Sequence, residues 1–256
     1  MRWSFFFFFL GGLHEVECQR AALVLRGMSA AENGRGPIDW RASRESLWAM
    51  YVEPRQAAHY IVDVYYHTYR SAVLGDVDAA YAPIRRRATK HFVSKNRFAA
   101  HQTSLLTALE TVVDPARYDE ICVARFDLLL QKPVANWNLD AESFNVPWRD
   151  LTKGKHCDVL WIFPGSVVPE IVADLKELLQ HPPHNNCCGG ELHFYHPTSL
   201  PMHYMFDGQF SSDTDWPEKF TYNVNPLYKL HRTRGGGNAT QRRRPRRSSH
   251  KKTNKS

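Results

Sequence analysis

Cysteine is scarce in this sequence, and the few cysteines lack the regular spacing of a disulfide framework. The five are Cys18, Cys122, Cys157, Cys187 and Cys188. Secreted domains that depend on disulfides carry even numbers of cysteines at repeated spacings and are usually much shorter than 256 residues. The disulfide-scaffold class is therefore excluded, and the redox compartment stays open.

A long apolar run is also missing, because the longest, residues 5–13, is far below the roughly 20 residues that a membrane-spanning helix needs. Arg2 followed by this run is typical of the first two regions of a secretory signal peptide, but Glu15 and Glu17 occupy the place of a small-residue cleavage site. Residues 1–20 are thus either an apolar leader, with membrane association and a secretory or Golgi location, or a low-complexity run on a cytoplasmic protein.

Acidic residues are absent from Lys229 to the end, where eleven of the 33 lysines and arginines lie. The preceding part holds all 26 acidic residues against 22 basic ones. Glycine, serine and charge of one sign are typical of a disordered segment, which we predict at residues 233–256. No aromatic residue interleaves its arginines for stacking on bases, so we expect no specific nucleic-acid partner. A basic-tailed nucleic-acid-binding protein remains one alternative hypothesis.

Apolar runs alternate with helical patterns through residues 21–232, which we predict to form one domain. Buried strands are indicated at residues 21–27, 61–66, 118–130, 158–163 and 192–195. Helices are indicated at residues 43–51, 97–113 and 166–179, the last of them capped by Ser166. This alternation predicts an α/β, Rossmann-like domain with a mainly parallel sheet flanked by helices. Ligands of such sheets bind outside the carboxyl ends of the strands, here residues 26–27, 67–68, 125–127 and 164–165.

The tripeptide Arg125-Phe126-Asp127 puts two opposite charges into the apolar run of residues 121–130. In a strand, Arg125 and Asp127 share one face, and burying them there is costly without a partner. One interpretation is an edge pair in which the two charges neutralise each other. The other is a cleft, in which the carboxylate holds a divalent cation and the guanidinium contacts phosphate oxygens through two parallel hydrogen bonds.

The order of several short motifs resembles predicted nucleotide-sugar glycosyltransferases of GT-A-like fold, which occur in protists, algae, large viruses and bacterial polysaccharide clusters. The motifs are ALVLRG at residues 22–27, VDVYYHTY at 62–69, YDxIxxxRFDL at 118–128 and DVLxxxP at 158–164. The resemblance covers residues 21–230. It implies an enzyme that moves a sugar from a nucleotide-diphosphate donor to a glycan or protein acceptor, such as a glycoprotein.

The same resemblance implies that Asp127 is the last acid of the family's metal-binding Asp-x-Asp element, with Arg125 in the place of the first acid. These two are the predicted catalytic residues, and Asp127 is the predicted ligand of Mn²⁺ or Mg²⁺. Loss of one carboxylate weakens or abolishes metal binding, and Arg125 then takes over neutralising the diphosphate. The loss also supports a second hypothesis, a catalytically inactive relative that serves as a glycan-binding or scaffold protein.

Two strand exits supply the predicted donor-binding residues. Arg26 and Gly27 either contact the nucleotide, with glycine allowing close backbone approach, or form an ordinary turn. His67 and Thr68 either reach the donor or, in the case of the histidine, belong to a hydrogen-bonded packing arrangement.

The predicted acceptor site is the stretch that contains Trp137, Asn138 and Trp148. It is either a platform on which a sugar stacks or a loop that packs its aromatic rings on the core. An inverting reaction also needs a general base, for which the sequence offers Asp150, Asp158, Asp207 and Asp213 without choosing among them.

Four histidines and two cysteines fall within residues 181–196, and all six side chains are usable zinc ligands. The paired Cys-x-x-Cys spacing of a zinc knuckle is absent, and the proline pair at 182–183 with the glycine pair at 189–190 favours a loop. A structural zinc site and a packed loop both remain open for this stretch.

Overall fold

A computed structural model describes residues 19–27, 39–69, 71–81, 86–91, 97–149, 159–181, 195, 197–205 and 228–230 of the chain. Within this part, no helix is both long and apolar enough to cross a membrane. Three predictions lie largely outside it: the leader apart from its last two residues, the strand at 192–195 apart from Tyr195, and the whole of the tail at 233–256.

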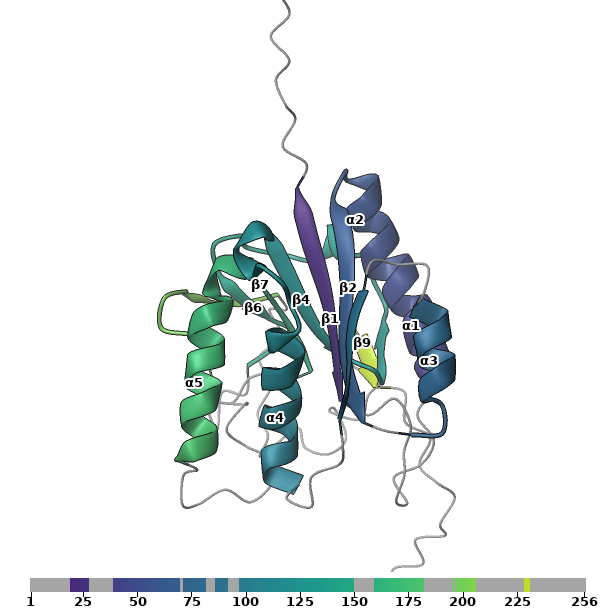
Figure 1. Cartoon of the computed structure of the whole chain (residues 1–256). Coiled ribbons are helices and arrows are strands. Elements are labelled where there is room, and N and C mark those ends of the chain that lie inside the picture. The colour runs from purple at the N-terminus through teal and green to yellow at the C-terminus, as the bar shows by residue number, and fades with distance from the viewer. Residues whose placement is uncertain are drawn as a thin grey trace, which may run out of the picture.

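A seven-stranded sheet forms the centre of the fold (Figure 1). Its strands stand in the order β3 (Arg86–His91), β2 (Ile61–Tyr69), β1 (Arg20–Gly27), β4 (Glu120–Arg125), β7 (Leu160–Phe163), β6 (Phe144–Val146) and β8 (Met202–Tyr204). The first four are parallel to one another, which confirms the predicted α/β class. β7 runs antiparallel to both of its neighbours, and β8 is parallel to β6. A separate antiparallel pair joins β5 (Leu128–Leu130) to β9 (Tyr228–Leu230).

The direction of β7 corrects one sequence prediction. A parallel neighbour needs a long crossover connection, and the described residues between β4 and β7 contain no α-helix that could make one. The exit of β7 at Pro164 and Gly165 therefore lies at the amino end of β4, away from the other three predicted exits. Gly165 is required there because an added Cβ would lie 1.9 Å from the carbonyl oxygen of Pro115.

Helices cover both faces of the sheet (Figure 1). One face carries α4 (Arg97–Glu110) and α5 (Val168–Gln180), and the other carries α1 (Trp40–Leu47), α2 (Glu53–Ala57) and α3 (Leu74–Tyr81), with a π-helical turn (Trp48–Val52) between α1 and α2. Alternate residues of β1 supply two cores. Ala22 and Val24 pack with α4 and α5, whereas Leu23 and Leu25 pack with the helices of the opposite face.

Two local predictions are wrong. Residues 118–130, predicted as one strand, form β4 and β5, which belong to different sheets and are separated by a turn at Phe126 and Asp127. Ser166 does not cap α5, because it lies inside the 3-10 turn Gly165–Val167. Val167 occupies the cap position and makes no side-chain hydrogen bond to the helix. The 3-10 turn, rather than a serine hydroxyl, provides the entry to α5.

Candidate functional site

Three of the predicted residues form a row across the carboxyl ends of adjacent strands. Arg26 of β1 is in register with His67 of β2 on one side and with Arg125 of β4 on the other. Neighbouring strands lie about 4.8 Å apart, so these side chains leave the sheet next to one another. Strand alternation puts all three on the face covered by α4, together with Val24. The next residues in register are Gly27, which ends β1, and Thr68, the last residue but one of β2.

The row is almost completely buried among the described residues. Arg26 is 2% exposed and His67 is fully buried, while the side chain of Arg125 keeps 12% of its surface. Burying cationic side chains costs several kcal/mol unless carboxylates, carbonyls or a ligand compensate them. Two arginines and a histidine thus lie at the edge where α/β sheets bind their ligands, and this position makes the row the candidate site.

Arg125 and Asp127 form a bidentate ion pair across the turn that follows β4. Nε of Arg125 donates to Oδ1 of Asp127 at 2.9 Å, and one Nη donates to Oδ2 at 2.8 Å. Phe126 points to the opposite face, where it is buried edge-on against the ring of Tyr66. Packing of this ring and pairing of the two flanking charges explain why the chain turns here instead of continuing as a strand.

Two serines that sequence reasoning missed hold the backbone on either side of the row. The Ser43 hydroxyl of α1 donates to the carbonyl of Leu128, directly after the turn, at 2.7 Å. The Ser104 hydroxyl of α4 accepts from the amide of Gly27 at 3.1 Å, and Gly27 adopts a φ of 95°, which favours glycine. A single serine in a helix produces no sequence pattern, so only the fold reveals these contacts.

The predicted acceptor platform is not supported by the placement of its rings. Trp137 and Trp148 are both buried in the core on the α1 face, so a sugar has no exposed ring face on which to stack. The indole nitrogen of Trp137 donates to the carbonyl of Lys132 at 2.9 Å. Asn138 is exposed, and its carbonyl lies 2.7 Å from a ring nitrogen of His203. The packed-loop alternative describes this stretch.

Asp127 does not fit the metal-ligand role predicted for it. Both of its oxygens accept hydrogen bonds from Arg125, so a divalent cation would have to displace a guanidinium from a carboxylate that is 2% exposed. The described part of the chain contains no cluster of three or more His, Cys, Asp or Glu side chains that could hold a metal ion. The zinc prediction for residues 181–196 falls almost entirely outside the described residues.

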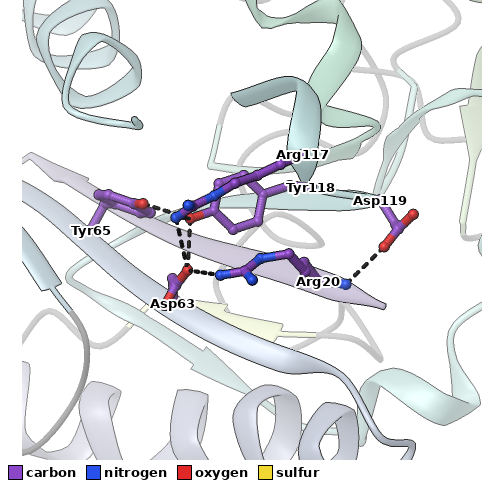
Figure 2. Close-up of polar contacts among 6 residues, drawn as sticks. All are labelled: Arg20, Asp63, Tyr65, Arg117, Tyr118 and Asp119. Atoms are coloured by element: carbon purple, nitrogen blue, oxygen red, sulfur yellow. Dashed lines mark hydrogen bonds and ion pairs between the residues drawn. The ribbon is translucent and has the colours of Figure 1, made fainter. Parts of the chain in front are cut away.

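A second buried polar cluster lies at the opposite, amino end of the sheet (Figure 2). One carboxylate oxygen of Asp63 accepts from the Tyr118 hydroxyl at 2.8 Å, from Arg20 at 3.1 Å and from Arg117 at 3.3 Å. The hydroxyls of Tyr118 and Tyr65 are 2.6 Å apart. Burial, followed by the hydrogen bond with Tyr65, raises the pKa of Tyr118, which therefore stays a hydrogen-bond donor at neutral pH. This cluster ties β1, β2 and the start of β4 together.

The same end of the sheet contains a cavity of about 560 Å³. Glu120 lines it and is held by Arg55, with 2.9 Å between Nε and Oε1, and by the Tyr51 hydroxyl at 2.7 Å. Asp140, another lining residue, accepts from the Ser143 hydroxyl and from the amide of Glu142. The carboxylates of this cavity are thus engaged by neighbouring groups, and its lining includes none of the predicted donor-binding or catalytic residues.

No protein-family model matches this sequence, and no curated protein matches it in sequence. Solved structures do match. The fold is similar to that of GT-A-like glycosyltransferases. The apo-form glycosyltransferase GlyE of Streptococcus pneumoniae is 12% identical, with a TM-score of 0.42 over 69% of this chain and 42% of GlyE. The chain thus spans less than half the length of GlyE.

Two further structures show how broad this similarity is. A Drosophila galactosyltransferase 7 mutant in complex with manganese, UDP-Gal and xylobiose is 7% identical, with a TM-score of 0.40 over 84% of this chain and 72% of its own. A nucleotidyl transferase of Methanothermobacter is 15% identical, with a TM-score of 0.37 over 69% of this chain and 81% of its own. These values describe a shared arrangement of strands and helices and assign no activity.

Proposed function

We propose that this protein transfers a sugar from a nucleotide-diphosphate donor to a glycan or protein acceptor at the carboxyl ends of β2, β1 and β4. The observation that carries the proposal is the row of His67, Arg26 and Arg125 in register across three parallel strands. Open α/β sheets bind their ligands at this edge, and paired arginines suit the charge of a diphosphate. The resemblance of the motifs that contain these residues supports the same activity.

The chemistry is a displacement at the anomeric carbon of the sugar. The acceptor hydroxyl forms a bond to that carbon, the bond to the diphosphate oxygen breaks, and negative charge grows on the leaving nucleoside diphosphate. Guanidinium groups held in a buried position stabilise this charge without reorganising during the reaction. The acceptor's proton goes to a general base, and the four aspartates predicted for that role lie outside the described residues.

A second candidate function is binding of the nucleotide sugar without transfer. It is favoured by the bidentate pairing of Asp127, because this carboxylate is engaged by Arg125 and does not act as a base in this arrangement. Both candidates require the donor to bind at the same row of residues, so only turnover separates them.

Release of nucleoside diphosphate from UDP- and GDP-sugars, with and without Mn²⁺, tests the proposal. CMP-linked sugar, which carries a single phosphate, serves as the donor control. We expect Arg125→Gln to lower the rate about 100-fold, as loss of one preorganised charge-stabilising donor does. Arg41→Gln is the matched control, because Arg41 pairs with Asp76 on the surface and its side chain is 60% exposed. Donor-induced thermal stabilisation without turnover would select the second candidate, and neither effect with any donor would refute both.

A further inference from the structure

The cavity at the amino end of the sheet is separate from the row of residues at the carboxyl end. Its volume of about 560 Å³ lies within the roughly 300–1,000 Å³ that small-molecule sites occupy. β4 begins at Glu120, which lines the cavity, and ends at Arg125, which belongs to the row, so five steps of strand place the two roughly 17 Å apart. A small ligand in the cavity therefore lies away from the group that reacts at the row.

The charges of the lining are wrong for a phosphate or a nucleotide. Its three carboxylates belong to Asp119, Glu120 and Asp140, and its one basic side chain is that of Arg55. Nε and one Nη of Arg55 donate to Glu120, so this arginine neutralises a carboxylate of the same lining. The remaining negative charge repels anions at short range. The cavity therefore favours a neutral or cationic ligand that donates hydrogen bonds.

The three carboxylates do not converge on one point. The part of the chain that the structure describes includes all three, and it contains no group of three or more acidic, histidine or cysteine side chains that could hold a metal ion. Acceptors distributed over a cavity suit a ligand whose hydrogen-bond donors are also distributed. A saccharide, with a hydroxyl on most of its ring carbons, has this property, whereas a single ammonium group does not.

Two of these carboxylates are held in place and keep the capacity to accept further hydrogen bonds. Asp140 accepts from the Ser143 hydroxyl at 2.7 Å and from the amide of Glu142 at 3.0 Å, and both bonds lower its pKa. Asp119 accepts from the amide of Arg20 at 2.7 Å (Figure 2). A carboxylate offers about four lone-pair sites, so each of the two can also accept from a ligand.

The walls of the cavity are rigid before any ligand binds. Asn145, which is 2% exposed, accepts from the amide of Asp140 at 2.9 Å and donates to the carbonyl of Ile162 in β7 at 3.1 Å. These bonds tie the turn that carries Asp140 to the sheet. A preorganised polar lining lowers the entropic cost of binding a ligand.

The lining also supplies an aromatic ring and a hydroxyl. Tyr60 is half-buried, and the guanidinium of Arg55 lies 5.1 Å from the centroid of its ring, which restrains the ring. Ser166 is exposed, and its hydroxyl can both donate and accept. A pyranose packs its C–H groups on an aromatic ring and donates its hydroxyls to carboxylates, so this combination fits a sugar.

We propose that this cavity is a second, non-catalytic site that binds a neutral saccharide, with Tyr60 as the packing ring and Asp119 and Asp140 as acceptors for sugar hydroxyls. The proposal goes beyond the transfer reaction, because it depends on the chemistry of the cavity and not on the row of His67, Arg26 and Arg125.

Saturation-transfer NMR with the full chain tests the proposal. The saccharide probes are cellobiose, lactose and xylobiose, each at about 10 mM, a concentration at which even millimolar complexes are populated. Putrescine is the cationic probe and UDP the anionic one. We expect saturation transfer to at least one disaccharide, and we expect UDP not to displace it, because the cavity repels anions.

Two pairs of variants locate the bound sugar. Asp140→Asn should weaken binding about 10-fold, because a charged acceptor is lost, whereas Glu142→Gln, the same change on an exposed side chain outside the lining, should alter binding by less than about twofold. Tyr60→Leu should weaken binding about 5- to 10-fold, and Tyr60→Phe, which keeps the ring, should retain it within about twofold. Asp119→Asn provides an independent test from another segment, and thermal unfolding establishes that each variant is folded.

The outcomes separate this proposal from the proposed transfer. Disaccharide binding that weakens in Asp140→Asn and Tyr60→Leu but not in their controls would support it, with or without turnover of a donor. Putrescine bound in preference to every disaccharide, without dependence on the ring of Tyr60, would overturn it in favour of a cation site. Disaccharide binding that UDP displaces and that only Arg125→Gln weakens would place the sugar at the row, which overturns the proposal and leaves the transferase standing. Absence of saturation transfer to all three disaccharides would overturn the proposal alone.

Discussion

An Asp63→Asn substitution removes one charge from the buried cluster at the amino end of the sheet while keeping the shape of the side chain. Asp63 is 3% exposed, and one of its oxygens receives hydrogen bonds from Arg20, Arg117 and Tyr118 (Figure 2). Breaking a fully buried ion pair by removing one partner costs about 3–5 kcal/mol. Here the two arginine side chains are 24% and 37% exposed, so water compensates part of the loss.

We therefore expect Asp63→Asn to lower the free energy of unfolding by about 2–3 kcal/mol, measured by urea denaturation with an unchanged m-value. For a domain of this size, that corresponds to a fall in Tm of about 5–10 °C. The matched control is Asp76→Asn. Asp76 also pairs with an arginine, but its side chain is 61% exposed, so its loss should cost less than about 1 kcal/mol.

Equal costs for the two substitutions would refute the reasoning, because Asp63 is buried and accepts from three donors, whereas Asp76 is exposed and is paired with Arg41. A double-mutant cycle sharpens the test. Tyr118→Phe removes the hydroxyl that donates to Asp63, so the combined variant should lose about 1 kcal/mol less than the sum of the single losses. An additive cycle would mean that the hydroxyl and the carboxylate do not stabilise the fold through each other.

Three further outcomes follow from the packing. Gly165→Ala should destabilise the chain by more than about 2 kcal/mol, because the added Cβ would lie 1.9 Å from the Pro115 carbonyl oxygen. Gly75→Ala, in open space on α3, should stabilise the chain by up to about 1 kcal/mol. Chemical denaturation measures both changes. Burial raises the pKa of Tyr51, so the folded state binds more protons than the unfolded state above about pH 10. The contribution of Tyr51 to the free energy of unfolding should be fully present below that pH and should decrease as the pH rises further. The absorbance at 295 nm should show that tyrosine ionisation accompanies unfolding. Burial also raises the pKa of the Cys122 thiol, which should react with DTNB only after denaturation.

The elements of the α/β core were predictable because buried strands and amphipathic helices leave different local patterns of apolar residues. The runs at residues 21–27 and 61–66 became β1 and β2, and the pattern at 97–113 became α4. The sequence could not reveal strand order or register, since these depend on contacts between segments far apart in the chain. The cross-strand row of His67, Arg26 and Arg125 is such a contact, although each residue was separately predicted at a strand exit.

The wrong predictions share a physical cause: the local pattern of residue types does not reveal which groups a side chain contacts in the folded protein. Apolar residues on both sides of Phe126 predicted a continuous strand, but the ion pair across that residue turns the chain. The aromatic residues Trp137 and Trp148 fit a sugar platform as well as a core, and only burial distinguishes the two. Serine is a favoured residue type at helix caps, but Ser166 lies inside a 3-10 turn.

The two arginine–aspartate arrangements differ in what they can do for the fold. Asp63 is bonded to Arg20 and Arg117, which lie 43 and 54 residues away in the sequence. That cluster therefore joins distant segments, and the tertiary structure that it stabilises offsets the cost of desolvating its charges. Arg125 and Asp127 are two residues apart, and a pair so close in sequence restrains little beyond its own turn. Burying such a pair beside another arginine brings the fold little stability in return for its cost. In keeping with the proposed function, we therefore assign this pair at the carboxyl end of the sheet to ligand binding and the Asp63 cluster to stability.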